Sequence, residues 1–101
     1  MRNVSTIKLT GSVVKADDRT TANGFQILTI TVAGDAKSRD GSKDIPFYQQ
    51  VDLLGGYAAF MRDQVQVGAN VTVLGTLSQR RWEDKDGNRR STVQIVADSV
   101  A

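Results

Sequence analysis

Alternating apolar and polar residues predict two strands near the start of the 101-residue chain. Residues 7–13 alternate with a period of two, which is typical of a strand with one apolar face. Asn23-Gly24 is a strong hairpin signal, and it opens a β-branched run over residues 25–33 that predicts the second strand. Residues 34–44 are polar and predict a mobile loop.

A third strand is expected from Pro46, which is tolerated at the start of a strand. Phe47, Val51 and Leu53 then share one face of that strand, and we expect this face to point inward. The glycine pair at 55–56 is expected to end the strand.

The second half of the chain predicts one short helix and two further strands. Residues 57–64 form the helical patch, and apolar residues recur at helical spacing at Ala58, Met61 and Val65. Alternation resumes over residues 70–79, and Asp86-Gly87 predicts a turn into a last strand over residues 91–100. Three strands, a short helix and two strands are the order of an all-β, five-stranded OB-fold Greek-key barrel, here one domain over residues 1–101.

Composition argues against an enzyme. The chain has no cysteine and no histidine, so disulfides, the usual zinc sites and histidine-based catalytic triads are excluded, and we expect no catalytic residue, metal or cofactor. The acidic residues lie mainly beside turn signals, as solvated turn carboxylates do. No apolar run approaches the ~20 residues of a membrane helix, and the N-terminus lacks the apolar region of a secretory signal.

Charge is concentrated in the predicted last hairpin, although the net charge is only +2. Five cations lie between Gln79 and Ser91 against three acidic residues. The cations are Arg80, Arg81, Lys85, Arg89 and Arg90. Such a basic hairpin on a nearly neutral body is a candidate phosphate-binding surface, and the alternative is an ordinary charged, soluble turn.

The only tryptophan belongs to this hairpin. If Val71, Val73 and Leu77 face the core, a period of two places Arg80 and Trp82 on the opposite face. An exposed indole beside cations is a platform on which any nucleobase can stack. The alternative is an indole folded onto the barrel rim or buried against a second subunit.

The outward face of the third strand offers weaker candidates. Tyr48 would be a second stacking platform and Leu54 an apolar contact, whereas Asp52 on that face opposes phosphate. Lys8 in the first strand and the loop cations Lys37 and Arg39 are candidates for backbone contacts; the alternative for each is plain surface.

These residues resemble the bacterial single-stranded-DNA-binding protein family. The most specific match is the last hairpin, with seven matched positions: Gly75-x-Leu77-x-x-Arg80-x-Trp82-x-Asp84-x-x-Gly87-x-x-Arg90. Ile7-x-Leu9-x-Gly11, the stretch over residues 23–33, and Val51-x-Leu53-x-Gly55 also match in order, so the resemblance covers nearly the whole chain.

The resemblance implies an OB barrel that binds and protects single-stranded DNA in replication, recombination and repair. It implies stacking at Trp82 and Tyr48, and Leu54 lies where the family often has a stacking phenylalanine. A tryptophan usual after the second strand has no counterpart around Lys37, and Gln50 replaces a basic residue. We therefore expect a reduced surface, with weaker or shorter-range binding per subunit or with more reliance on charge. Assembly as a homo-tetramer is expected ahead of a dimer, in the bacterial cytoplasm on the nucleoid.

The family usually continues into a disordered tail with an acidic tip that recruits replication and repair proteins. This sequence ends at Ala101, so it is either one domain of a longer chain or a form without the tail. Three alternative functions stay open at this point. They are a primosomal accessory protein that acts mainly through protein partners, an RNA-binding OB domain, and a structural oligomerisation barrel.

Overall fold

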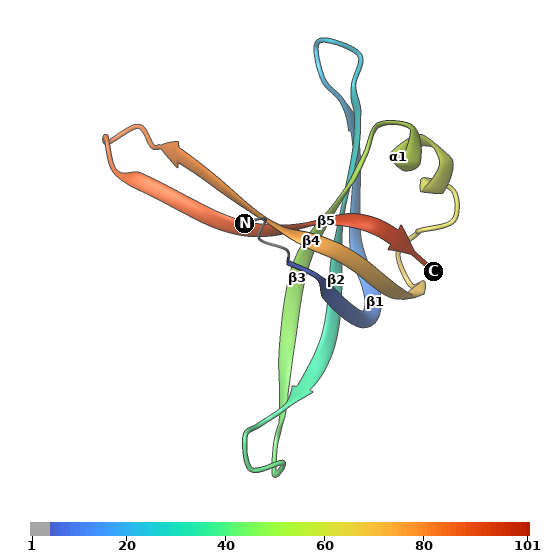
Figure 1. The fold of residues 1–101 in the computed structure, drawn as a ribbon, viewed down its shortest axis with the longest axis vertical. Helices are drawn as coiled ribbons and strands as arrows, with labels where there is room; N and C mark the ends of the chain where they lie inside the picture. The colour runs from blue at the N-terminus through green and yellow to red at the C-terminus, as the bar shows by residue number, and fades with distance from the viewer. Residues whose placement is uncertain (1–4) are drawn as a thin grey trace.

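The computed structural model describes residues 5–101, which form a five-stranded closed barrel with one short helix. The elements are β1 (Ile7–Thr20), β2 (Gln26–Lys37), β3 (Asp44–Leu54), α1 (Gly55–Met61), β4 (Asn70–Glu83) and β5 (Arg89–Val100). Around the barrel the strands follow the order β1-β2-β3-β5-β4 (Figure 1). The OB-type architecture predicted from the sequence is therefore confirmed.

Four antiparallel pairings and one parallel pairing close the barrel. β1 pairs with β4 over its first half and with β2 over its second half. The register of β1 shifts between Val13 and Lys15, which is a β-bulge. β3 and β5 run parallel, with Val51 level with Ile95. The bulge allows β1 to bend from one neighbour to the other and so to serve two sides of the barrel.

The barrel interior is the core of the molecule. Its most completely buried side chains are Val13, Ile30, Val32, Val51, Leu53 and Val73. Three apolar residues in and after α1 also join this core: Ala58, Met61 and Val65. Their burial confirms the predicted inward face of the helix. An isolated helix of this length would not be stable, so α1 depends on this packing.

Three strand pairs continue beyond the core as hairpin arms (Figure 1). We name them the β1–β2 arm (residues 19–27), the β2–β3 arm (residues 34–47) and the β4–β5 arm (residues 78–92). The Asn23-Gly24 hairpin is confirmed at the tip of the first, where Gly24 has a φ of 81°. In the third, the turn predicted at Asp86-Gly87 lies between β4 and β5.

The arms correct several predicted boundaries. Residues 34–44 are not a loop throughout, because β2 runs to Lys37 and β3 begins at Asp44. Pro46 lies within β3, level with Asp35, rather than at the start of the strand. The glycine pair 55–56 opens α1 instead of separating it from β3.

Two residues predicted to face the core lie beyond its edge. Leu77 is exposed because β4 has already left the barrel at that point. Phe47 is only half-buried, and its ring lies over Gly34 within the β2–β3 arm. Among residues 5–101, no helix is long and apolar enough to cross a membrane.

Candidate nucleic-acid interface

Trp82 projects from the β4–β5 arm and lies outside the core, as the alternation predicts. Its side chain is 44% exposed. The guanidinium carbon of Arg80 lies 5.8 Å from the centroid of the indole ring, within the range of a cation–π interaction. Arg90 lies directly opposite Trp82 on β5, so its side chain shares the same face. The indole therefore has one guanidinium along its strand and another across the ladder.

Asp84 organises the turn that ends this arm. Its carboxylate accepts the backbone N–H groups of Asp86 at 3.0 Å and Asn88 at 2.9 Å, and the Nε–H of Arg90 at 2.9 Å. The Asn88 bond, followed by the Arg90 bond, lowers the pKa of Asp84 below its ordinary value. Arg90 is thereby held beside Trp82, but part of its charge is neutralised by the carboxylate.

Tyr48 lies on β3 and is 72% exposed, pointing away from the core as predicted. It lines a hollow of about 410 Å³ together with Thr31, Gln50 and Thr92. Thr92 lies level with Arg80 on the neighbouring strand. A continuous outer surface therefore runs from Tyr48 through Thr92 and Arg80 to Trp82, and we call it the Tyr48–Trp82 surface.

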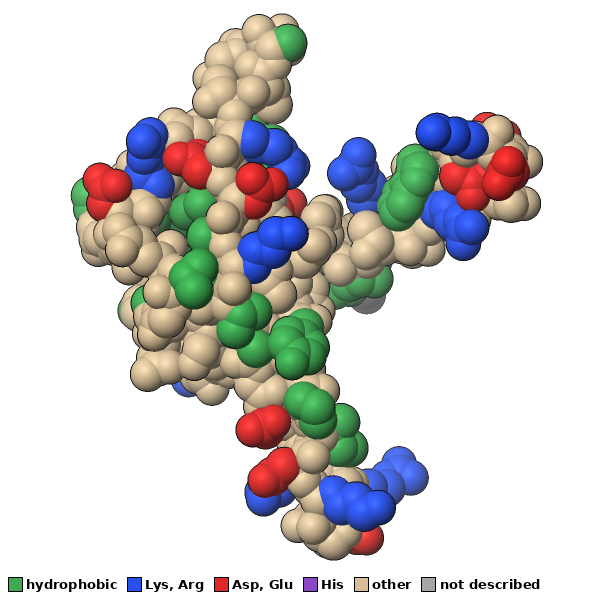
Figure 2. Space-filling view, turned by 180° about the vertical axis from the view of Figure 1, so that it is seen from behind, with side chains coloured by type: hydrophobic (Ala, Val, Ile, Leu, Met, Phe, Trp, Pro, Cys, Tyr) green, Lys and Arg blue, Asp and Glu red, His purple; other side chains and the backbone are tan. Residues whose placement is uncertain are grey.

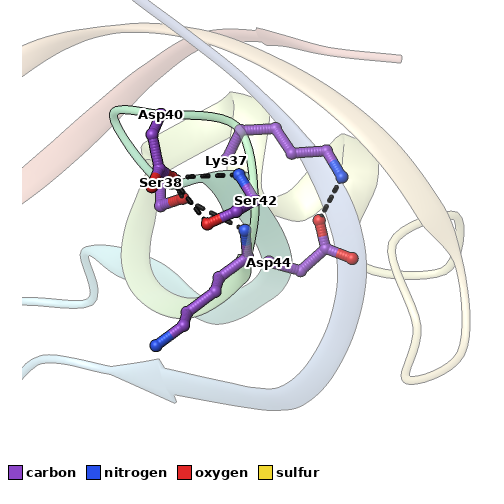
Figure 3. A network of polar contacts seen from close by, with 6 residues as sticks. Lys37, Ser38, Asp40, Ser42 and Asp44 are labelled. Atoms are coloured by element: carbon purple, nitrogen blue, oxygen red, sulfur yellow. Dashed lines mark hydrogen bonds and ion pairs between the residues drawn. The ribbon is translucent and has the colours of Figure 1, made fainter.

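The tip of the β2–β3 arm is a tight polar turn (Figure 3). Asp40 Oδ1 accepts the Ser38 hydroxyl at 2.8 Å, the Ser42 hydroxyl at 2.7 Å and the Ser42 backbone N–H at 3.0 Å. Lys37 forms an ion pair with Asp44 at the base of this turn. The arm therefore presents Lys37 next to an acid, whereas no ion pair involves Arg39 among residues 5–101.

The three hydrogen bonds at Asp40 lower its pKa from 3.8 to about 2, with the Ser42 hydroxyl as the largest cause. Because the folded value is depressed, the turn is stabilised at pH values above 3.8, and this stabilisation is lost as pH falls through about 2. We expect the Asp40 carboxyl carbon and the Ser42 amide to titrate together near pH 2 in NMR spectra. A midpoint near 3.8 would contradict the hydrogen-bonded turn.

Several predicted site residues do not gather on the Tyr48–Trp82 surface. Arg81 points to the opposite face of the β4–β5 arm from Arg80, although the hollow of about 600 Å³ that it lines also includes Trp82 and Arg90 at the edge of the arm. Lys8 is level with Leu74 on the β1–β4 side of the barrel, away from β3. Leu54 shares the outward face of β3 with Tyr48 but lies at the far end of the strand, beyond Asp52. Lys85 belongs to the turn at the tip of the β4–β5 arm.

Sequence reasoning missed two residues that the fold brings to this face. Thr92 on β5 lies between Tyr48 and Trp82 on the outer surface. Lys15 on β1 is level with Thr31 of β2, and both side chains point outward. Simple alternation from the buried Val13 would turn Lys15 inward, but the bulge between them reverses its direction. Figure 2 shows Lys and Arg side chains gathered on the β4–β5 arm and at the tip of the β2–β3 arm.

The chain is similar to known proteins over nearly its whole length. The chain is 36% identical over 96% of its length to the single-stranded DNA-binding protein of Thermus thermophilus, and 34% identical over 98% to that of Thermus aquaticus. It spans 38% and 39% of those relatives, which is about two-fifths of their length. A crystal structure of a deletion mutant of the Thermus aquaticus protein matches 95% of this chain and 48% of that one, with a TM-score of 0.79 and 32% identity.

The same barrel is found in a more distant protein. The Plasmodium falciparum SSB in complex with ssDNA has a TM-score of 0.83 over all of this chain and 94% of its own, at 18% identity, which shows the fold alone. The model of the Single-strand binding protein family matches residues 4–101. On this match and on the Thermus relatives, the chain belongs to the single-strand binding protein family.

Proposed function

We propose that the chain binds single-stranded DNA without sequence preference and protects it in replication, recombination and repair. The observation that carries the proposal is the Tyr48–Trp82 surface, where an exposed indole on β4 lies under a guanidinium and a second exposed ring lies on β3, with β5 between the two strands. Base–aromatic stacking contributes ~1–3 kcal/mol per base and tolerates every sequence. Relatives named single-stranded DNA-binding proteins support the same ligand.

The cations divide into two roles in this proposal. Arg80 and Arg90 neutralise phosphates next to the stacked base at Trp82, and Lys85 does so at the tip of the arm. Lys37 and Arg39 contact DNA phosphates on the β2–β3 arm. Arg81 lines one hollow with Trp82 and Arg90, so DNA bound at Trp82 reaches it at the edge of the arm, whereas Lys8 contacts DNA only if the DNA strand continues around the barrel.

The proposed activity is binding without a chemical step. Because the chain belongs to the Single-strand binding protein family, we propose no enzymatic activity for it. We further propose a homo-oligomer, a tetramer ahead of a dimer, that acts with replication and repair proteins. We place this activity in the bacterial cytoplasm, on the nucleoid.

Intrinsic fluorescence tests the proposal directly, because Trp82 is the only tryptophan of the chain. Titration with oligothymidine is expected to quench the emission as a base stacks on the indole. Absence of quenching would rule out stacking at Trp82. Competition between DNA and RNA oligomers of equal length then separates a DNA-binding protein from an RNA-binding OB domain, because RNA that displaces DNA at equal concentration contradicts a DNA preference.

Binding is also expected to weaken as salt rises. Each phosphate contact on a single strand releases counterions with a slope of about 0.7 in log K against log salt. Arg80→Ala should therefore make this slope shallower by about 0.7, as well as weakening binding. Arg62→Ala is the matched control, because Arg62 pairs with Asp18 away from the Tyr48–Trp82 surface. An affinity that does not respond to salt would contradict phosphate contacts.

A further inference from the structure

We propose that Asp84 is a positioning residue for DNA binding, which fixes the Arg90 guanidinium beside Trp82 and leaves its terminal N–H groups to a phosphate. This inference rests on the proposed function, since it concerns the same ligand at the same arm. Charge alone predicts that removing a carboxylate strengthens the binding of a polyanion. Because Asp84 acts by positioning Arg90, its removal weakens binding instead.

The turn at the tip of the β4–β5 arm fixes the Asp84 carboxylate. The Asp84 N–H donates to the Asn88 carbonyl at 2.9 Å, and the Gly87 N–H donates to the Asp84 carbonyl at 3.1 Å. Oδ1 of Asp84 also accepts the backbone N–H groups of Asp86 and Asn88. The Asp84 side chain is only 22% exposed. The direction of the carboxylate is therefore set by the backbone of the turn and does not depend on Arg90.

The second oxygen of this carboxylate, Oδ2, is the acceptor for Arg90. The Arg90 Nε–H donates to it at 2.9 Å, and the Arg90 side chain remains 60% exposed. A guanidinium has five N–H groups in a planar fork, and this bond uses the one at the base of the fork. The four N–H groups on the two terminal nitrogens therefore remain for a phosphate, which arginine binds with two parallel hydrogen bonds.

The bond to Asp84 also determines where the Arg90 guanidinium lies relative to the indole. Arg90 starts on β5 level with Trp82, and Asp84 follows Trp82 by two positions toward the tip of the arm. Arg80 precedes Trp82 by two positions, and its guanidinium carbon lies 5.8 Å from the ring centroid. A nucleotide stacked on the indole has a phosphate on each side, so the two guanidinium groups match the two directions in which the DNA strand continues.

Holding Arg90 in advance increases affinity, because a mobile arginine loses rotamer freedom when it binds a phosphate. This loss corresponds to roughly two- to tenfold in affinity for each side chain that binding immobilises. The opposing effect is repulsion between Asp84 and the phosphate. Three N–H donors already surround the carboxylate, and salt screens charges at an exposed surface, so the repulsion is the smaller effect.

Asp84→Asn tests positioning against charge. The asparagine Oδ1 still accepts the two turn amides, whereas its Nδ2 is a donor and cannot accept the Arg90 Nε–H. We expect this variant to bind a short oligothymidine about two- to tenfold more weakly, as measured by fluorescence anisotropy. An affinity equal to or higher than that of the unmodified protein would overturn the positioning role.

Asp86→Asn is the matched control, since it removes a carboxylate from the same turn. No ion pair involves Asp86 among residues 5–101, and its backbone N–H to Asp84 is retained in the variant. Its affinity for the oligomer should stay the same or rise slightly, and more so at low salt. If Asp86→Asn weakened binding as much as Asp84→Asn, the effect would not be specific to the residue that holds Arg90, and the positioning role would be overturned.

A double-mutant cycle with Arg90→Ala shows whether Asp84 acts through Arg90. Once the guanidinium is absent, Asp84→Asn should no longer weaken binding. An equal loss of affinity in both backgrounds would mean that the asparagine disturbs only the turn, and it would overturn the positioning role. The cycle therefore distinguishes positioning of the guanidinium from a structural role in the arm.

The Arg90 Nε–H resonance in NMR spectra gives a readout that is independent of affinity. Its bond to Asp84 should slow the exchange of this proton with solvent in the free protein and in the DNA complex, and Asp84→Asn should abolish that protection. Rapid exchange in the free, unmodified protein would contradict the anchoring bond.

The outcomes separate this inference from the proposed function. If the unmodified protein does not bind oligothymidine, the proposed function fails and the positioning role fails with it. If the protein binds the oligomer but Arg90→Ala or Asp84→Asn leaves the affinity unchanged, only the positioning role is overturned.

Discussion

Replacing Trp82 with alanine is expected to weaken the binding of a short oligothymidine by ~5- to 150-fold, the equivalent of ~1–3 kcal/mol of base stacking. The indole lies outside the core, so its loss should change stability little and binding strongly. Fluorescence anisotropy of a labelled oligomer measures the affinity. Thermal unfolding of the same variant checks that the barrel is intact.

Two comparisons make this result specific. Trp82→Phe keeps a flat ring above the arm and should retain much of the affinity lost in Trp82→Ala. Phe60→Ala removes an exposed aromatic ring from α1 instead and should bind like the unmodified protein. Equal affinities for Trp82→Ala and the unmodified protein would show that DNA, if bound, does not stack there. Unchanged DNA binding with lost contact to a protein partner would favour the primosomal accessory function.

Replacing Gly11 with alanine is expected to destabilise the barrel by ~1–3 kcal/mol. A Cβ atom at this position would lie 2.3 Å from the backbone carbonyl oxygen of Ala33 and 2.9 Å from Val32 Cγ1. The first of these atoms belongs to the backbone of β2, so no side-chain rotation relieves the contact, and β1 and β2 must separate. A loss of this size is a large fraction of the ~5–15 kcal/mol that stabilises a typical domain.

Gly56→Ala is the matched control, since it adds the same methyl group where no atom lies within 4 Å. Gly56 is in α1, where alanine is favoured over glycine by about 1 kcal/mol, so this variant should be as stable as the unmodified protein or slightly more stable. Urea unfolding monitored by circular dichroism compares the two variants. Equal midpoints would contradict the close approach of β1 and β2.

Prediction from the sequence succeeded at strand positions where one face of the strand packs on the core and the other faces solvent. Val51, Leu53 and Val73 alternate with outward residues, and all three are buried. The same alternation places Tyr48 and Trp82 outside the core, as observed. One-face burial imposes a period of two on the amino-acid sequence, and this period can be recognised without knowing which strands are neighbours.

Prediction failed where the strands leave the barrel. Residues 34–37 have the polar sequence of a loop, yet they continue β2, because the backbone pairing with β3 extends to them. No core lies beneath this part of the sheet, so an apolar alternation is not required there. Leu77 has the residue type and parity of a core position but lies past the barrel edge. Arg80 and Arg81 are adjacent in the sequence and were grouped together, yet they belong to opposite faces of the arm.

The amino-acid sequence by itself determined the order of the elements, the inward faces of the strands and the outward direction of the single indole, since each follows from local periodicity. Only the tertiary structure decided which outward residues become neighbours. Three such arrangements depend on strand register. They are the bulge that turns Lys15 outward, the approach of Thr92 to Tyr48, and the alignment of Asp17 on β1 with Asp52 on β3 across β2. Alternation shows which face of its own strand a side chain takes, whereas the register between strands is also set by the turns that join them and by the bulge in β1.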